Sequence, residues 1–226
     1  MDYLVVLIPS LPFIAAAIIG FGHLFNRITG QEGEYISAGI AKSAITLSCL
    51  IAISLLVTDL LGMNSDSITI GKWLDSGNLV VELNFITTGF SVIIAALFSI
   101  ILVVVTRFST NYIHKEPGFH RFFFVLSLFS SAMLFLILSG NAIGTFVGWE
   151  LAGLCSYLLI SFAYDRPVAA LNATRVFVTN RIGDAGFILG IALSFYFAGT
   201  VNWVNLNELA GSLATPTATV ISLCFV

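Results

Sequence analysis

The residue with the clearest chemical potential is Glu150, a carboxylate inside a long apolar run. It lies nine residues into a predicted span over residues 141–164, about 14 Å from the start of that helix and near the centre of a bilayer. An ionised carboxylate at this depth is costly, so it needs a cationic partner, a water-filled cavity or a proton. Because each of these suits a proton carrier, we predict that Glu150 relays protons. The alternative is a carboxylate that only fixes helix packing.

Two further charges, Arg181 and Asp184, fall in the predicted span over residues 176–198. Their spacing of three residues puts both on one helix face, where they can pair with each other or bridge to a neighbouring helix. We predict that they take part in proton transfer with Glu150. The alternative is an ion pair that pins one helix to the next, because buried pairs are often fixed architecture.

Other polar and small residues lie near these charges in the sequence, and their types indicate a function less specifically. Polar groups that could hydrogen-bond water beside the carboxylates, or equally satisfy a neighbouring helix, are those of Trp149, Ser156, Tyr157, Thr179 and Asn180. Small residues that would let helices approach closely are Gly148, Gly153, Gly183, Gly186 and Gly190. Gly186 and Gly190 form a GxxxG pattern, and packing is the role we expect for all of these glycines.

Several other kinds of site are not expected in this chain. The sequence has no glycine-rich nucleotide loop, no Walker A sequence and no cluster of metal ligands, so we expect neither a metal nor a redox cofactor. Cys49, Cys155 and Cys224 lie in apolar runs without CxxC spacing and are expected to be buried thiols. His114 and His120 fall in a predicted loop, where solvated histidines are expected. The net charge of -3 and the scattered Lys and Arg give no patch for nucleic acid.

The elements that must position these groups are transmembrane helices. Hydrophobic residues make up 58% of the 226 and charged residues only 9%, whereas soluble domains carry roughly a quarter charged residues. Apolar runs of about 20 residues match the roughly 30 Å hydrocarbon core of a bilayer. Hydropathy predicts spans at 3–21, 43–62, 86–106, 122–140, 141–164 and 176–198, and a seventh helix that begins near Thr217 and is incomplete at Val226. We therefore predict an all-α integral membrane protein, a polytopic helix bundle of about six complete transmembrane helices, and a portion of a longer protein.

The predicted helices divide into two units. Residues 1–106 hold the first three helices and a polar connection over residues 63–85, where a Ser76-Gly77-Asn78 turn and the alternating residues 79–83 predict a hairpin on one membrane face. Residues 107–226 hold helices four to six and the start of the seventh.

Basic residues are concentrated on one side of the predicted bundle. That side collects Arg27, Lys42, Arg107, Lys115, Arg121, Arg166 and Arg175. The opposite side has Lys72 beside Asp59, Asp66, Asp75, Glu82 and Glu208. By the positive-inside rule the first side is cytoplasmic, or matrix in an organelle, and the N-terminus lies outside. We favour a bacterial inner membrane, with the mitochondrial inner membrane as the alternative.

The stretch from Tyr112 to Gly190 resembles the antiporter-like membrane subunits of respiratory complex I, and most of all the chain 5 or subunit L family of NADH-quinone oxidoreductase. The residues that carry the resemblance are Leu138-Ser-Gly-Asn141, Gly148-Trp-Glu-Leu-Ala-Gly153 and Val178-Thr-Asn-Arg-Ile-Gly-Asp184. The combination of the Gly-Trp-Glu helix with Asn-Arg-Ile-Gly-Asp is specific to that superfamily. The Asp165-Arg-Pro-Val run departs from it, because complex I sequences usually carry a lysine near the start of helix six.

The resemblance implies the N-terminal part of an antiporter-like fold, in which residues 107–226 would begin the first antiporter-like repeat. It also implies a proton-translocating half-channel in the membrane arm of a redox-driven NADH:quinone oxidoreductase. In the family the glutamate that matches Glu150 pairs with a lysine of a broken seventh helix, which would lie beyond Val226, and the residues that match Arg181 and Asp184 modulate it. NADH, flavin, iron-sulfur clusters and quinone would be bound by partner subunits, and the other membrane subunits of the complex would be the partners. One alternative is a membrane subunit of a related sodium/proton antiporter or inorganic-carbon uptake system, and the transported ion could then be Na+ in place of H+. Another is a truncated structural segment without transport of its own.

Overall fold

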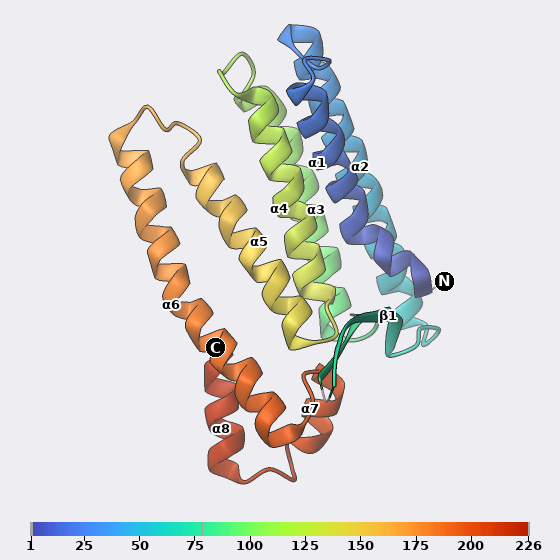
Figure 1. Cartoon of the computed structure of the whole chain (residues 1–226). Helices are drawn as coiled ribbons and strands as arrows, with labels where there is room; N and C mark the ends of the chain where they lie inside the picture. Colours follow the sequence, from blue (N-terminus) through green and yellow to red (C-terminus); the bar gives the residue numbers. More distant parts are fainter. Residues whose placement is uncertain (1, 78, 226) are drawn as a thin grey trace.

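The computed structural model describes residues 2–77 and 79–225, so Asn78 of the predicted turn and Val226 lie outside the described residues. Within these ranges it has six helices long and apolar enough to cross a membrane, which confirms the predicted fold class. The elements in chain order are a 3-10 helix at Asp2–Val6, α1 at Leu7–Leu24, α2 at Gly30–Leu60, β1 at Ser67–Ser76, β2 at Leu79–Ile86, α3 at Phe90–Tyr112, α4 at Phe119–Leu138, α5 at Ala142–Ile160, α6 at Pro167–Ala198, α7 at Trp203–Leu209 and α8 at Thr215–Cys224. Figure 1 shows the long helices running side by side, with the hairpin and α7 together at one end.

Two helices are much longer than hydropathy predicts. The second begins at Gly30 instead of residue 43, and the sixth begins at Pro167 instead of residue 176. The reason is that a hydropathy window detects the most apolar part of a helix and misses helical turns of mixed composition next to it. Pro167 occupies the first helical position, where its missing N–H costs nothing. The predicted bounds of both helices were therefore wrong at the N-terminal side.

The third helix starts at Phe90 rather than 86, because the preceding residues form a two-stranded hairpin. β1 and β2 pair antiparallel from Ser67 opposite Ile86 to Ser76 opposite Leu79. The hairpin is joined to the helices by a bridge between Phe85 and Ser139, just beyond the end of α4. α7, a seven-residue helix beyond α6, was missing from the prediction because it is too short to register in a hydropathy window.

α1 packs against both α2 and α4. Pro12 inside α1 has no N–H, so the carbonyl of Ile8, four residues earlier, lacks its usual helical donor. Ser48 of α2 donates its hydroxyl to that carbonyl at 2.5 Å. Ser131 of α4 donates to the carbonyl of Pro9 at 2.8 Å. Hydroxyls from two neighbouring helices thus bind α1 at the point where its own series of backbone hydrogen bonds is interrupted.

α5 and α6 stand on the other side of α4. α5 packs between α4 and α6, while α6 packs on α5 and α8, and Figure 1 shows α6 inclined away from the rest of the bundle. Only 17% of the apolar window of α6 is buried, against 50% for α4. The candidate site therefore lies between the most exposed spanning helix and its one long neighbour.

Candidate functional site

Three charged side chains meet between α5 and α6. One terminal guanidinium nitrogen of Arg181 lies 2.6 Å from a carboxylate oxygen of Glu150, and its Nε lies 2.8 Å from Oδ2 of Asp184. Since Glu150 is on α5 and the other two residues are on α6, one guanidinium bridges two helices and two carboxylates. Of the two arrangements that the sequence left open, the structure has both at once: the pair within α6 and the bridge to the neighbouring helix.

The two carboxylates have different surroundings. The side chain of Asp184 is 5% exposed, and its Oδ1 accepts a hydrogen bond of 2.8 Å from the indole N–H of Trp149. The side chain of Glu150 is 29% exposed, and Arg181 is the charged group that it contacts. Asp184 is therefore enclosed and held from two directions, whereas Glu150 is held from one direction and keeps an open side.

Arg181 is also supported by an aromatic ring of its own helix. Its guanidinium carbon lies 4.9 Å from the centre of the Phe177 ring, a cation–π contact at a spacing of four residues along α6. Phe177 in turn contacts the ring of Tyr157 on α5, with 5.4 Å between ring centres. Sequence reasoning missed Phe177, although an aromatic residue four positions before an arginine in a helix is a recognisable signal.

A glycine lets α5 approach α4 beside this site. A Cβ built on Gly148 would lie 2.9 Å from the backbone nitrogen, Cα and Cβ of Leu136, closer than ordinary contact. At Gly153 a Cβ would meet only the amide nitrogen of Asn180, at 3.7 Å. On α6, a Cβ at Gly190 would lie 3.0 Å from the Cys224 side chain of α8, and one at Gly186 would lie 3.5 Å from the Cys224 carbonyl. The helices thus approach most closely at Gly148 and Gly190.

The remaining polar residues predicted beside the carboxylates have varied positions. Thr179 is exposed and donates its hydroxyl to the carbonyl of Arg175 within α6. Asn180 is half-buried against α5 at Gly153, and Ser156 and Tyr157 are half-buried one to two turns beyond Glu150. Among the described residues, Trp149 is therefore the member of this group that bonds directly to one of the three charges.

Asn141 positions the start of α5. Its side-chain oxygen accepts a hydrogen bond of 2.7 Å from the N–H of Gly144, which caps the helix. Its amide nitrogen donates to the carbonyl of Glu82 at 2.7 Å and to the side-chain oxygen of Asn84 at 2.6 Å. One asparagine therefore ties α5 to the hairpin, and this joint fixes the end of the helix that carries Glu150.

The histidines lie at the end of the bundle where the basic residues gather. His120 belongs to α4, not to the loop that the sequence predicted, and its ring nitrogen Nδ1 lies 2.9 Å from the hydroxyl of Ser37. It also stacks on His23, with 5.1 Å between ring centres. His114 remains in the loop, where it pairs with Glu34 at 3.0 Å. No group of three or more potential metal ligands occurs among the described residues.

Comparison with known proteins places this arrangement among related membrane subunits. Residues 139–226 match the family model described as NADH:quinone oxidoreductase/Mrp antiporter, transmembrane region, and residues 73–123 match that of the complex I chain 5 N-terminus. The chain is 36% identical to NAD(P)H-quinone oxidoreductase subunit 5, organellar chromatophore 1, of Paulinella chromatophora, over 98% of this chain and 34% of the relative. It is 34% identical to NAD(P)H-quinone oxidoreductase chain 5 of a Synechocystis species, over 89% of this chain and 30% of the relative.

A solved structure has the same fold. The chain is similar to one from the membrane-bound sulfane sulfur reductase, an archaeal respiratory membrane complex, with a TM-score of 0.77 and 21% identity over 98% of this chain and 43% of that one. The chain spans about a third of the length of the curated relatives that it matches. The first of the two matched regions contains Glu150, Arg181 and Asp184. The chain belongs to the antiporter-like membrane subunits of the NADH-quinone oxidoreductases, the chain 5 family, of which it matches the N-terminal portion.

Proposed function

We propose that this chain forms part of a proton-translocating membrane-arm subunit of a redox-driven NADH:quinone oxidoreductase, with Glu150 as the proton carrier. The observation that supports this is the bridging position of Arg181 between Glu150 and Asp184. With both carboxylates ionised, the three side chains carry one net negative charge. A single proton makes the set neutral, so the site is suited to binding and releasing one proton at a time.

Glu150 takes that proton. Asp184 is enclosed, and its two oxygens face the Trp149 N–H and the Arg181 guanidinium. Glu150 has one charged contact and a more open side chain. Because Glu150 has a single ion pair, with Arg181, to give up, it is the carboxylate that we propose to bind and pass on the proton. The proton then moves on to further groups of the complete subunit.

The experiment is a Glu150→Gln variant in the assembled complex, reconstituted in vesicles, with proton uptake measured per NADH oxidised. Glutamine keeps the size of the side chain and removes the titrating group, so we expect proton movement to fall while subunit content stays normal. Glu208→Gln, on exposed α7, is the matched control and leaves pumping unchanged. Normal pumping by the Glu150→Gln complex would refute the proposal.

A structural role is the second candidate, because the same contacts also tie α5 to α6. It predicts that Arg181→Met, Asp184→Leu and Glu150→Leu together preserve both assembly and transport, as apolar replacements of a whole set of buried charges often do; Glu150 is replaced as well because it would otherwise lose its partner. Loss of transport with normal assembly would exclude this role and support the first.

The remaining parts of the proposal rest on the family to which the chain belongs. We place residues 1–106 and 107–226 as the two units of the chain, with the basic end of the bundle on the cytoplasmic or matrix side of an energy-coupling membrane. Partner subunits would bind NADH, flavin, iron-sulfur clusters and quinone, and other membrane subunits would cover the open face of α6. A particle without NADH oxidation that exchanges Na+ for H+, or takes up inorganic carbon, would assign the chain to the related transporters instead.

A further inference from the structure

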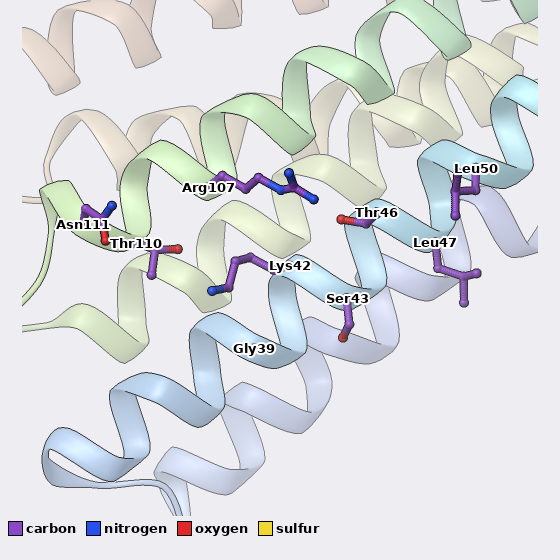
Figure 2. Close-up of a pocket in the computed structure, with 9 residues that line it drawn as sticks. All are labelled: Gly39, Lys42, Ser43, Thr46, Leu47, Leu50, Arg107, Thr110 and Asn111. Carbon is purple, nitrogen blue, oxygen red and sulfur yellow. The ribbon is translucent and has the colours of Figure 1, made fainter.

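A groove between α2 and α3 holds two cations that the proton-transfer site does not use. The cavity has a volume of about 680 Å3 and is lined by Gly39, Lys42, Ser43, Thr46, Leu47, Leu50, Arg107, Thr110 and Asn111. Figure 2 shows Lys42 and Thr46 of α2 and Arg107 and Thr110 of α3 directed into the space between the two helices. Its walls are polar toward one end and apolar, at Leu47 and Leu50, toward the other.

The two charges in the groove are not neutralised by the part of the chain that the structure describes. Neither Lys42 nor Arg107 forms an ion pair within residues 2–77 and 79–225. In the same part of the chain, neither the Thr46 hydroxyl nor the Asn111 amide donates a hydrogen bond to another group, so both remain free to bind a ligand. Two unneutralised cations beside free donors are complementary to an anion with several oxygen atoms.

The position of the two cations along the helix axes, relative to the membrane core, identifies the kind of anion. At about 1.5 Å per residue, Lys42 lies about 27 Å from the Leu60 end of α2, and Arg107 lies about 26 Å from the Phe90 start of α3. Both side chains are therefore level with each other, at the far edge of a hydrocarbon core roughly 30 Å thick. That edge is where phospholipid phosphates lie, and Leu47 and Leu50 continue the groove toward the bilayer centre as an acyl chain would.

We propose that this groove binds an anionic phospholipid of the leaflet at the basic end of the bundle, with its phosphate between Lys42 and Arg107 and one acyl chain along Leu47 and Leu50. Basic pockets between transmembrane helices on this side of a membrane commonly hold such headgroups. The site does not depend on proton transfer by Glu150, which lies on a different pair of helices.

The test measures lipid binding to the intact detergent-solubilised protein by native mass spectrometry, with dioleoyl phosphatidylglycerol, dioleoyl phosphatidylcholine and inorganic phosphate as separate probes. We expect Lys42→Gln with Arg107→Gln to weaken phosphatidylglycerol binding about 30-fold, on the usual contribution of a basic residue near an anionic surface. Phosphatidylcholine binding stays the same. Arg175→Gln, an exposed arginine of α6 outside the groove, is the control and binds both lipids normally.

A second variant separates shape from charge. A Cβ built on Gly39, which lines the groove, meets nothing within 4 Å among the described residues, so the side chain of Gly39→Leu starts in open space and both cations are kept. We expect it to reduce phosphatidylglycerol binding at least about tenfold, and Gly39→Ala, which brings the same gain in helix propensity, to have little effect.

Three results would overturn the proposal. Phosphatidylglycerol binding that is the same in the double variant and the parent would show that the cations do not hold the lipid. Displacement of bound lipid by millimolar inorganic phosphate, with phosphate held equally well alone, would show a site for free anions. Unchanged lipid binding together with loss of a co-purifying subunit in the double variant would show that an acidic protein surface fills the groove.

Discussion

Replacing Gly148 with alanine tests how closely α5 must approach α4. The new Cβ would lie 2.9 Å from three atoms of Leu136, two of which belong to the backbone and cannot rotate away. Carbon atoms in good contact are about 3.5 Å apart, so α5 has to retreat by about 0.6 Å or bend. Overpacking of this kind costs about 1–3 kcal/mol, and we take about 2 kcal/mol as the expected loss of stability.

Gly153→Ala is the matched control. It lies on the same helix and brings the same gain in helix propensity, but its Cβ meets only the Asn180 amide at 3.7 Å. The difference between the two variants therefore measures the contact with Leu136 alone.

The assay is thermal unfolding in mild detergent, followed with a maleimide dye that becomes fluorescent on reaction with thiols. Cys49 and Cys155 are buried and react as the protein opens, and Cys224 is replaced by serine in every variant because it is only half-buried. At about 2–4 °C per kcal/mol for a chain of this size, Gly148→Ala should melt about 4–8 °C below Gly153→Ala. Melting within about 1 °C of each other would refute the argument that Gly148 sets the distance between α4 and α5.

Two further substitutions test hydrogen bonds beside the site. Trp149→Phe removes the N–H that Asp184 accepts but keeps a ring to pack on Phe187, so it should destabilise the protein by about 1.5–3 kcal/mol in the maleimide assay, and an unchanged melting temperature would show that the bond contributes nothing. Asn141→Ala removes the cap of α5 and both donors to the hairpin, including the one to Asn84, and should cost about 2–4 kcal/mol and speed proteolysis of the hairpin. Asn141→Asp keeps the cap, so equal proteolysis of the two variants would show that the donors do not hold the hairpin.

The number of spanning helices and their order could be predicted from the sequence, because an apolar run of about 20 residues has few other uses. The helix ends could not, because the first residues of α2 and α6 are less apolar than the spans that follow them, and hydropathy alone does not show that they are helical. α7 was not predicted for a related reason, because seven residues with a polar face have the sequence pattern of a loop.

The three charges of the candidate site could be predicted from the sequence, but the contact of Arg181 with Phe177 and the geometry of the site could not. The spacing of Arg181 and Asp184 predicted a shared face, and the depth of Glu150 predicted a need for a partner. Nothing in the sequence indicates how far α5 and α6 are rotated about their axes, so the bridge from Arg181 to Glu150 became visible only in three dimensions. The same holds for the groove at Lys42 and Arg107, which are 65 residues apart in the chain and meet because α2 and α3 are antiparallel neighbours.

The backbone hydrogen bond that Pro12 removes from α1 bears on the biogenesis of the protein. Alone in a bilayer, α1 would expose the Ile8 carbonyl to lipid, where an unsatisfied acceptor is costly. The hydroxyl that satisfies it belongs to Ser48 in the very next span to leave the ribosome. The first two helices are therefore a self-sufficient pair for membrane insertion, and a translocation channel that released α1 before α2 had arrived would release an incompletely bonded helix. The fourth helix, which brings Ser131 to α1, can join that pair later.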